Sequence, residues 1–481
     1  MSTSYIIALD QGTSSCRALA VDPQGRIFAQ EQRVFSPRRL RKGLSEYDGK
    51  EVLETQLTVL HALLDRIGPQ HAAAIAVCSQ RSTVVLWDQT TGEVLAPVLT
   101  WEDGRALKQS EEVSLSQAQV HLQTGLFKTP YFSAPKIAWC LQEIASVQQA
   151  ARQGTLLIGP VATHLIWHLT KGAVFASDPT LAQRTLLWNI DCWQWSEKLC
   201  QAFGVPVSCL PHVFPSAADY GAYIYKGVSI PIYACVADQQ AAAAYHGLRV
   251  GKTSINYGTG AFVLHHTGEK LAVLPGMLSS VAATVTDRER AYLLEGPVFS
   301  AGSVLEWLRA KGFLADLDEL ERLCSQAREP VQFLPALGGL GAPYWDYRTQ
   351  VGFRGITPQT KSADWIAGAL QGIACRIADI IYYLRAQGQK VQSPVQVSGG
   401  LVRSNYLLAF QADILQTQLY VCPHVQSTAL GAALLAGRKL GWKVENWLQA
   451  PIRMVSPHIS AVQSQARYQT WQHFVQSVRN I

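Results

Sequence analysis

The apolar positions at the start of the chain fall into three short runs separated by polar and turn-forming residues. The first two runs cover residues 5–9 and 17–21, and the third begins near Arg26. Acidic, glycine and hydroxyl residues at 10–15, and an Asp-Pro-Gln-Gly sequence at 22–25, interrupt them. Short apolar runs bounded in this way are typical of strands joined by tight turns. The pattern therefore predicts strand, hairpin, strand, turn, strand.

The pattern then changes to a helical period before it returns to a strand. Residues 49–67 carry apolar side chains at helical spacing, and residues 73–78 form another continuous apolar run. These two segments are predicted as a helix and a buried strand. A β-β-β-α-β order predicts a mixed sheet covered by helices, which is an α/β architecture.

The second half of the chain repeats this order of elements without repeating the sequence. A predicted strand at 252–257 runs through Gly-Thr-Gly into a second strand, and another strand at 291–295 leads to a helix at 301–311. A strand at 395–398 ends in two glycines, and residues 428–440 form a helix of mostly small residues. The recurrence is architectural, and it indicates two related halves.

The length of the chain supports a division into two domains. A chain of 481 residues exceeds the size that one hydrophobic core usually serves. An alanine-rich helix that begins at Asp238 closes the first half. We therefore expect one domain over residues 1–247 and a second over residues 248–481.

Composition and charge exclude several classes of protein. Hydrophobic residues make up 48% and charged residues 16%, which is a globular rather than a disordered composition. The net charge of +6 is mild, and the dense basic run at 38–42 is interpreted as a solvated loop, so no nucleic-acid partner is expected. None of the ten cysteines forms a CxxC pair, and no apolar run is long enough to span a bilayer. With no signal-peptide pattern at the N-terminus, we expect a cytoplasmic protein with buried free thiols.

The turn after the first strand is the first candidate for chemistry. Asp10 stands at the strand end, and Gly12, Thr13, Ser14 and Ser15 follow it. An acid, a glycine that admits close backbone approach, and three hydroxyls suit Mg²⁺ and phosphate. Arg17, just beyond the turn, would stabilise transferring charge. A plain hairpin with polar turn residues is the alternative.

Two glycine turns in the second half could serve the same ligand. Gly258-Thr259-Gly260 lies between two predicted strands and could approach phosphates, although many hairpins contain glycine pairs. Gly399-Gly400 lies between a strand and a helix, where glycine leaves room for a flat ring and a helix N-terminus favours an electronegative group. Each turn alone also fits a structural role. Three such turns at strand ends indicate a ligand that meets both domains.

A carboxylate follows the apolar run at 232–237. Asp238 and Gln239 stand where a strand passes into a helix. Asp238 can act as the N-cap of that helix. It can also act as a general base that takes a hydroxyl proton, with Gln239 binding the neighbouring hydroxyl. The local pattern leaves both roles open.

Together these segments resemble the FGGY family of carbohydrate kinases, and within it the glycerol kinases most closely. The resemblance runs from about residue 5 to about residue 445 and rests on an ordered series of motifs. They lie at residues 8–17, 130–139, 237–242, 257–260, 294–296, 338–346 and 428–433.

The resemblance implies two actin-like, ribonuclease-H-like domains, each a mixed five-stranded sheet flanked by helices, with the active site in the cleft between them. It implies an ATP-dependent phosphotransferase that uses Mg²⁺ and acts on a small polyol or sugar, and a homodimer or homotetramer is possible. The first domain would carry the polyol site, the catalytic base and the first phosphate motif, and the second would bind the nucleotide.

The resemblance also assigns roles to individual positions. Asp238 would be the general base, Asp10 would hold Mg²⁺ through water, and Arg17 would face the phosphates. The nucleotide would contact Thr13, Ser14, Thr259, Gly302, Glu306, Gly400 and Ser404. The polyol pocket would be lined by Arg81, Trp101, Tyr131 and Gln239.

The predicted pocket departs from that of glycerol kinases at two places. Glycerol kinases carry Arg-Glu where this chain has Arg81-Ser82, so a carboxylate that accepts bonds from glycerol is missing. A charged acceptor is worth about 1.5–3 kcal/mol for a hydroxyl, so its loss weakens glycerol binding. Trp101 is followed by Glu102, Asp103, glycine and arginine, a pattern closer to sugar kinases of the family. Glu102 or Asp103 replaces the missing acceptor, or both are surface charges.

Three hypotheses follow from these features. The first is a kinase for a polyol, sugar alcohol or ketose larger than glycerol, with Asp238 as base. The second is a true glycerol kinase that makes glycerol 3-phosphate. The third is a non-catalytic sensor of sugar or nucleotide, which the presence of both Asp10 and Asp238 disfavours.

Overall fold

The computed structural model describes residues 4–41, 43–423, 426–447 and 453–479. Contacts divide these residues into two compact units, each discontinuous in sequence. The first contains residues 4–247, 279–292 and 426–447, and the second contains residues 248–278, 293–423 and 453–479. Two segments that the division at residue 247 assigns to the second domain therefore pack within the first unit.

A mixed sheet forms the centre of the first unit. Its strand order is β14-β15-β6-β1-β2-β3. β1 runs parallel to β6 and antiparallel to β2, and β15 runs parallel to β6. The sheet has six strands in the described residues rather than the five expected, because the hairpin strand β14 extends one edge. The bounds are β1 Tyr5–Gln11, β2 Ser15–Val21, β3 Ile27–Val34, β6 Ala72–Ser79, β14 Ala222–Tyr225 and β15 Val228–Ala237.

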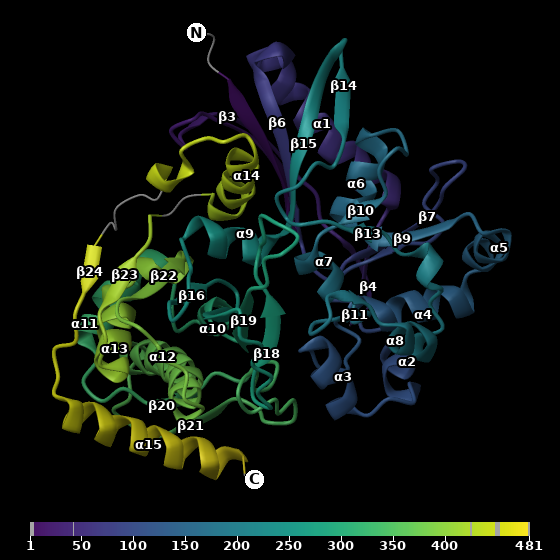
Figure 1. Cartoon of the computed structure of the whole chain (residues 1–481). Helices are drawn as coiled ribbons and strands as arrows, with labels where there is room; N and C mark the ends of the chain where they lie inside the picture. Colours follow the sequence, from purple (N-terminus) through teal and green to yellow (C-terminus); the bar gives the residue numbers. More distant parts are fainter. Residues whose placement is uncertain (1–3, 42, 424–425, 448–452, 480–481) are drawn as a thin grey trace. The chain divides into compact units, whose positions relative to one another are not determined.

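Helices cover both faces of this sheet, so its central strands read as continuous apolar runs. Every residue of β1 is buried. Alternate residues point to opposite faces: Ile7 packs in the cluster that contains helix α1 (Gly49–Ile67), while Ile6 lies under helix α14 (Ser427–Lys439). α14 also packs against α9 (Asp238–Tyr245), as Figure 1 shows.

A second sheet of the first unit has the order β4-β5-β8-β7-β9. The basic run that was interpreted as a loop forms β4 at its edge. These strands are β4 Arg38–Arg41, β5 Leu44–Tyr47, β7 Val84–Asp88, β8 Val98–Leu99 and β9 Leu156–Pro160. The remaining helices of this unit are α2 Leu107–Glu112, α3 Gln117–Thr124, α4 Ser133–Glu143, α5 Ala145–Gln153, α6 Val161–Leu169, α7 Pro179–Gln183 and α8 Glu197–Phe203.

The second unit is built on another mixed sheet, in which the strands of this unit follow the order β19-β17-β16-β22-β23-β24. β16 runs antiparallel to β17 and parallel to β22. The strands are β16 Thr253–Tyr257, β17 Ala261–Gly268, β19 Tyr292–Val298, β22 Val395–Gly399, β23 Leu419–Val421 and β24 Arg453–Val455.

Helices complete the second unit. The longest, α12 (Ser362–Ala386), is buried along most of its length and packs against α13 and α11. The others are α10 Gly302–Ala310, α11 Leu320–Gln326, α13 Asn405–Leu415 and α15 Ala461–Arg479, with the short strands β20 Gln332–Leu334 and β21 Gly352–Arg354 beside them. Of the helices described in either unit, none combines the length and apolar composition needed to cross a membrane.

Candidate active site

Three parallel strands of the first unit end side by side. In the register of β1, β6 and β15, Asp10 lies opposite Cys78, and Cys78 lies opposite Val236. Carboxyl ends of parallel strands share one edge of a sheet, and ligands bind at such edges in open α/β folds. The residues just beyond this row are therefore brought together, among them Arg81 and Asp238.

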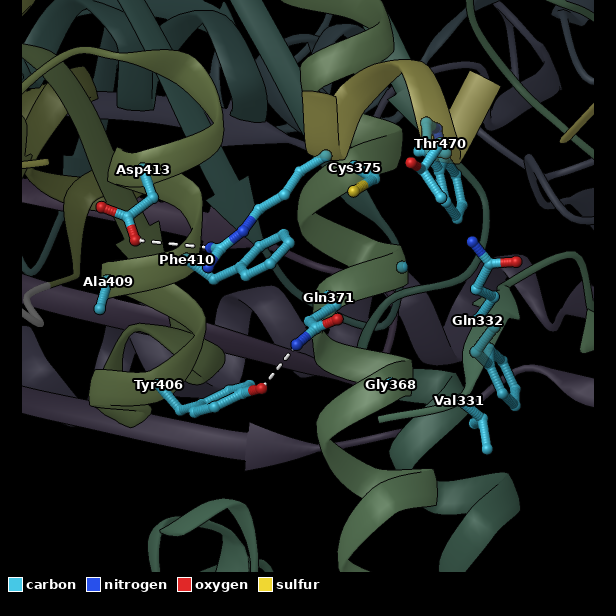
Figure 2. A pocket seen from close by; sticks show the side chains of 14 residues that line it. Val331, Gln332, Gly368, Gln371, Cys375, Tyr406, Ala409, Phe410, Asp413 and Thr470 are labelled. Atoms are coloured by element: carbon cyan, nitrogen blue, oxygen red, sulfur yellow. Dashed lines mark hydrogen bonds and ion pairs between the residues drawn. The ribbon is translucent and has the colours of Figure 1, made fainter. Parts of the chain in front are cut away.

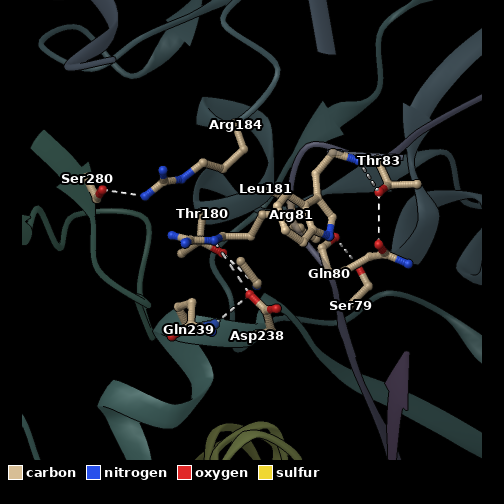
Figure 3. Close-up of polar contacts among 12 residues, drawn as sticks. Ser79, Gln80, Arg81, Thr83, Thr180, Leu181, Arg184, Asp238, Gln239 and Ser280 are labelled. Carbon is tan, nitrogen blue, oxygen red and sulfur yellow. Dashed lines mark hydrogen bonds and ion pairs between the residues drawn. The ribbon is translucent and has the colours of Figure 1, made fainter. Parts of the chain in front are cut away.

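Asp238 lies at the start of α9, next to a buried arginine. Its Oδ1 atom accepts a hydrogen bond from the Gln239 N–H at 2.7 Å and lies 3.6 Å from Arg81 Nε (Figure 3). The Arg81 side chain is 5% exposed and that of Asp238 is 25% exposed. Ala237, not Asp238, occupies the N-cap position of α9. Of the two roles left open by the sequence, capping is therefore not the one observed.

Asp10 is a buried carboxylate that is repelled by the negative charge of a second carboxylate, Asp238. Burial and then the negative charge of Asp238 raise the pKa of Asp10 to about 6, against the opposing effects of Arg17 and the Cys78 thiol. Arg17 NH1 lies 4.0 Å from Asp10 Oδ2 and also donates to Gln426 Oε1 at 2.7 Å. A cation at this place would relieve the repulsion between the two carboxylates.

The donor set of this region fits Mg²⁺ better than a transition metal. No group of three or more His, Cys, Asp or Glu side chains in the described ranges could hold a metal ion. Mg²⁺ is commonly held by one or two carboxylates together with waters and substrate phosphates. Asp10 therefore suits a magnesium ion that arrives with a nucleotide.

The turn after β1 is tied to the neighbouring aromatic residues. Gly12 N–H donates to Ser15 O at 3.0 Å and closes the turn. Trp101 Nε1 donates to Thr13 Oγ1 at 3.0 Å, and Tyr47 OH donates to Thr13 O at 2.6 Å. Ser14 is exposed and Ser15 is partly exposed. The structure thus brings a predicted phosphate-binding residue into contact with a predicted pocket residue.

Trp101 and Tyr131 form one aromatic pair. Their ring centroids are 5.5 Å apart with an interplanar angle of 53°. The fully buried Lys136 donates from Nζ to Tyr131 O at 2.5 Å and holds the backbone of the pair. Burial lowers the pKa of Lys136 to about 7, although the charge of Asp103 opposes the change. Two aromatic faces next to polar groups suit a small ligand with apolar carbons and hydroxyls.

Ser82 has an unusual backbone and a hydroxyl group without a partner. Its φ angle is 64°, a left-handed conformation that a non-glycine residue rarely adopts. The residue is 3% exposed, and its Oγ makes no hydrogen bond to any residue that the structure describes. Ser133 Oγ donates to the Ser82 carbonyl at 3.2 Å and supports the turn. Strained residues and unpaired buried polar atoms concentrate at ligand sites.

Asp103 has a complete set of partners within the protein. It accepts from the Ser45 N–H at 2.7 Å and from Arg105 through Nε and NH2, both at 2.9 Å. Its side chain is fully buried. Glu102 instead lies at the surface edge, 3.2 Å from Arg39 NH2. These contacts give Asp103 a structural role in joining β5 to the loop after Trp101, and its buried side chain is not a surface charge.

In the second unit, the turn between β16 and β17 packs against the start of α10. Gly302 N donates to Gly258 O at 3.0 Å, and a Cβ atom at Gly302 would lie 2.7 Å from the same oxygen. Thr259 is exposed, and its carbonyl accepts from the N–H groups of Ala301 and Ser303. Glycine is therefore required where the turn meets the helix. Thr259 is exposed beside this helix N-terminus, where its hydroxyl can serve a ligand.

The predicted Gly399-Gly400 turn lies at the same edge of the sheet. Tyr257 and Gly399 are register partners at the carboxyl ends of β16 and β22, so Gly258 to Gly260 and Gly400 follow neighbouring strand ends. Gly399 has a φ of 98°, and a Cβ there would collide with Tyr257 O. Gly400 is exposed, and a Cβ there would meet nothing within 4 Å. Open space next to a fixed turn is what a bound ring needs.

The other two predicted nucleotide residues have partners of their own. Ser404 is the buried N-cap of α13, where its Oγ accepts from Leu407 N–H at 3.1 Å and donates to Glu321 at 2.8 Å. Glu306 is exposed on α10 and pairs with Arg309 at 2.6 Å. The structure therefore explains Ser404 as a helix cap.

The sequence reasoning missed a buried polar cluster next to Asp238. Asp178 accepts hydrogen bonds from Thr180 and Ser216, and Thr180 Oγ1 accepts one from Ala237 N–H at 2.8 Å. The available signal was the Asp-Pro-Thr sequence, since an Asp followed by Pro is typical of a helix start. Asp178 is indeed the N-cap of α7.

Two pockets lie outside the predicted site residues. One of about 480 Å³ in the second unit is lined by α12, α13, α15 and β20, and Figure 2 shows the Gln371–Tyr406 hydrogen bond on its wall. A pocket of about 610 Å³ in the first unit is lined by the start of α1, residues 91–97 and the His164–His168 pair.

Comparison with known proteins identifies the class. The model of the N-terminal domain of the FGGY family of carbohydrate kinases matches residues 5–244, and that of the C-terminal domain matches residues 253–440. The fold and these matches define a two-domain α/β sugar-kinase fold with mixed sheets flanked by helices. The chain belongs to the FGGY family of carbohydrate kinases. It is therefore a phosphotransferase of an ATP-using family with an alcohol group as acceptor, and the non-catalytic hypothesis is set aside.

Several individual proteins are similar to this chain over nearly its whole length. The chain is 34% identical to a glycerol kinase from Thermus brockianus, over 99% of this chain and 98% of that protein. It is 36% identical to a glycerol kinase from Shewanella pealeana, over the whole of both chains. A Plasmodium falciparum glycerol kinase with ADP superposes with a TM-score of 0.94 at 27% identity, over 99% of this chain and 98% of that chain. A xylulose kinase from Rhodospirillum rubrum shares the fold, with a TM-score of 0.87 at 21% identity over 98% and 99% of the two chains.

Proposed function

We propose that the chain transfers a phosphoryl group from Mg-ATP to a hydroxyl of a small polyol or sugar, with Asp238 as the general base. The observation that carries this proposal is the Asp238 carboxylate, partly exposed beside the buried Arg81 at the ends of β1, β6 and β15. In phosphoryl transfer, positioning and charge stabilisation supply most of the rate enhancement. A single well-placed carboxylate is enough to accept the proton of the attacking hydroxyl.

The residues around Asp238 have matching tasks in this proposal. Arg81 orients the base and one substrate hydroxyl, and Gln239 binds the neighbouring hydroxyl. Trp101 and Tyr131 present their faces to the carbon skeleton, since their rings lie 5.5 Å apart.

The phosphates and the metal are assigned to other residues. Asp10 holds Mg²⁺ through water, and Arg17 and the turn at 12–15 face the transferring group. In the second unit, Gly258 to Gly260, Gly302 and Gly399-Gly400 leave backbone room for the nucleotide. Bound Mg²⁺ would neutralise negative charge on the phosphates.

Ser82 favours an acceptor substrate that is larger than glycerol. The left-handed turn directs a short side chain where glycerol kinases carry a glutamate, and its buried Oγ has no protein partner. An unpaired buried hydroxyl is costly unless a ligand pairs with it. A tetritol, a pentitol or a ketose offers the additional hydroxyl that would pair with the Ser82 Oγ.

A second candidate is glycerol kinase activity itself. The observation in its favour is the series of relatives named glycerol kinase at 34–36% identity over nearly the whole chain. Asp103 does not supply the missing carboxylate, because its oxygens are bonded to Arg105 and Ser45. Glycerol would then be held without a charged acceptor at position 82.

ADP release tests both candidates. The purified protein is assayed with Mg-ATP and a panel of glycerol, tetritols, pentitols, ketopentoses, ketohexoses and heptuloses, with Asp238→Asn in parallel. A saturable rate with one larger compound, lost in the variant, supports the first proposal. If glycerol is preferred by orders of magnitude, the interpretation of Ser82 is wrong. If the variant retains full activity, Asp238 is not the base.

A further inference from the structure

Within the described residues, the last part of strand β15 has no neighbouring strand on one of its edges. β14 pairs only with residues 228–231 of β15, whereas β6 continues to pair as far as Ala237 on the other edge. The free edge still presents buried N–H groups, and such groups require acceptors. Cys235 N–H donates to Ser216 O at 3.0 Å, and Ala237 N–H donates to Thr180 Oγ1 at 2.8 Å. A carbonyl and a hydroxyl therefore replace the missing strand just before Asp238.

Both of these acceptors are held by one carboxylate. Asp178 is fully buried, and it accepts from Thr180 Oγ1 at 2.8 Å and from Ser216 Oγ at 2.7 Å. It also accepts from Leu181 N–H at 3.0 Å as the cap of α7. Ser216 Oγ in turn accepts from Thr284 N–H at 3.1 Å. Asp178 thus joins α7, the loop at Ser216 and, through Thr180, the end of β15.

The direction of the Thr180 hydrogen bonds follows from proton counting. A threonine hydroxyl has one proton to donate and lone pairs to accept with. The Ala237 N–H can only donate to Thr180 Oγ1, so the single Thr180 proton must point to Asp178. Burial raises the pKa of Asp178 to about 6, so its carboxylate is mostly ionised at neutral pH and accepts this proton. The lone pair is then left for Ala237 N–H. The carboxylate therefore determines which way the hydroxyl faces, and the hydroxyl determines where Ala237 lies.

The location of Ala237 matters because Asp238 follows it directly as the first residue of α9. Ala237 is the N-cap residue of α9 and has no side chain that could cap it. On the other side of α9, Gly431 of α14 lies so close that a Cβ would collide with Ala241 O. Two contacts thus set the position of Asp238, the first residue of α9. One is the hydrogen bond from Ala237 N–H to Thr180 Oγ1, and the other is the close packing of α9 against α14.

We propose that Asp178 and Thr180 are positioning residues that hold Asp238 in its catalytic orientation by fixing the Ala237 N–H. This inference rests on the proposed role of Asp238 as base. A displacement of about 1 Å in a catalytic group can lower a rate about 100-fold, so one hydrogen bond at this point controls turnover rather than binding. Both residues are fully buried, whereas the Asp238 side chain is partly exposed.

Thr180→Val tests the proposal, since valine keeps the shape of threonine but cannot accept a hydrogen bond. Thr180→Ser restores the hydroxyl. Thr170→Val is the matched control, because Thr170 Oγ1 likewise accepts a backbone N–H, that of Val174 at 3.2 Å, at the end of α6. Each variant is assayed with the best acceptor of the panel. We expect Thr180→Val to lower kcat about 10- to 100-fold with the KM for ATP unchanged. The kcat of Thr180→Ser should stay within about threefold of that of the parent, and the kcat of Thr170→Val should equal that of the parent.

Amide hydrogen exchange at Ala237 gives a second readout that does not depend on activity. Thr180→Val should accelerate this exchange, whereas Thr170→Val should not. A kcat of Thr180→Val within twofold of the parent, an equal loss in Thr180→Ser, or unchanged exchange at Ala237 would each overturn the proposal. Full activity of Asp238→Asn would instead show that the assignment of the base is wrong, whatever the exchange at Ala237.

Discussion

Arg81 Nε lies 3.6 Å from Asp238 Oδ1, and the two residues come from different strand ends. Arg81 follows β6, whose last residue, Ser79, is the register partner of Ala237 on β15. The pair is thus a direct product of the parallel pairing of β6 with β15. The Arg81 guanidinium is buried, whereas the Asp238 carboxylate beside it is partly exposed.

Asp238→Asn should abolish most of the turnover without unfolding the protein. Loss of a general base lowers kcat by about 10²- to 10⁴-fold, while the KM of the acceptor changes little because the amide still accepts a hydrogen bond. Steady-state kinetics with the best acceptor measures the effect. Asp219→Asn is the control, since Asp219 is exposed and accepts from Gly221 N–H at the surface. Equal activity of the two variants would contradict the assignment.

Ser82→Ala should weaken acceptor binding and leave the fold at least as stable. The Ser82 hydroxyl has no protein partner, so its removal relieves an unpaired buried polar atom, a change of about 1 kcal/mol in favour of folding. The KM of a larger polyol or ketose should rise by about tenfold, as expected for one lost hydrogen bond of about 1.5 kcal/mol. Thermal unfolding and kinetics measure the two effects.

The contrast variant for Ser82 is Ser464→Ala. The Ser464 hydroxyl is buried as well, but it donates to Ile414 O at 3.1 Å. This variant should lose about 1 kcal/mol of stability and keep its KM. If Ser82→Ala behaves in the same way, the Ser82 hydroxyl has no part in binding.

Asp10→Asn should stabilise the protein at neutral pH while removing activity that depends on Mg²⁺. The pKa of Asp10 is raised from 3.8 to about 6, so the native state binds more protons than the unfolded state between about pH 4 and pH 6. Stability from this group is present below pH 4 and is lost as the pH rises through 6. The variant should therefore exceed the parent by up to about 3 kcal/mol above pH 7 and equal it near pH 4. Urea unfolding at the two pH values measures this, and a difference independent of pH would contradict the prediction.

Gly399→Ala should lower the stability of the protein, whereas Gly400→Ala should leave stability nearly unchanged and weaken ATP binding. At Gly399 the positive φ and the collision with Tyr257 O should cost at least about 1–3 kcal/mol of unfolding free energy. At Gly400 a methyl group meets nothing, so stability should stay within about 0.5 kcal/mol. Only Gly400→Ala should raise the KM for ATP in a folded protein. An unchanged KM would remove Gly400 from the proposed nucleotide site.

Asp103→Asn should damage stability rather than substrate choice. Asp103 and Arg105 form a buried ion pair, and breaking such a pair costs about 3–5 kcal/mol. The temperature of thermal unfolding should therefore fall sharply, while the order of preferred acceptors stays the same. A variant with normal stability and altered preference would instead place Asp103 in the substrate pocket.

The prediction of local elements from the sequence succeeded where a short pattern decides the conformation. The alternation of apolar runs and turns correctly predicted β1, β2 and β6, and helical spacing correctly predicted α1 over Gly49–Ile67. The basic run at 38–42 was interpreted wrongly as a loop. Its residues 38–41 pair with β5, and pairing with a distant strand leaves no mark in local composition.

The sequence by itself determined the family, the order of strands and glycine turns along the chain, and the residue types at the strand ends. These features depend on local propensity and motif spacing, which involve residues that are close together in the sequence. Only the tertiary structure decided which side chains are already occupied. It paired Asp103 with Arg105, left the Ser82 hydroxyl without a partner and brought Thr180 to Ala237 across 57 positions of sequence. The physical reason is that hydrogen-bond satisfaction and burial depend on strand register and helix packing, which join residues far apart in the chain.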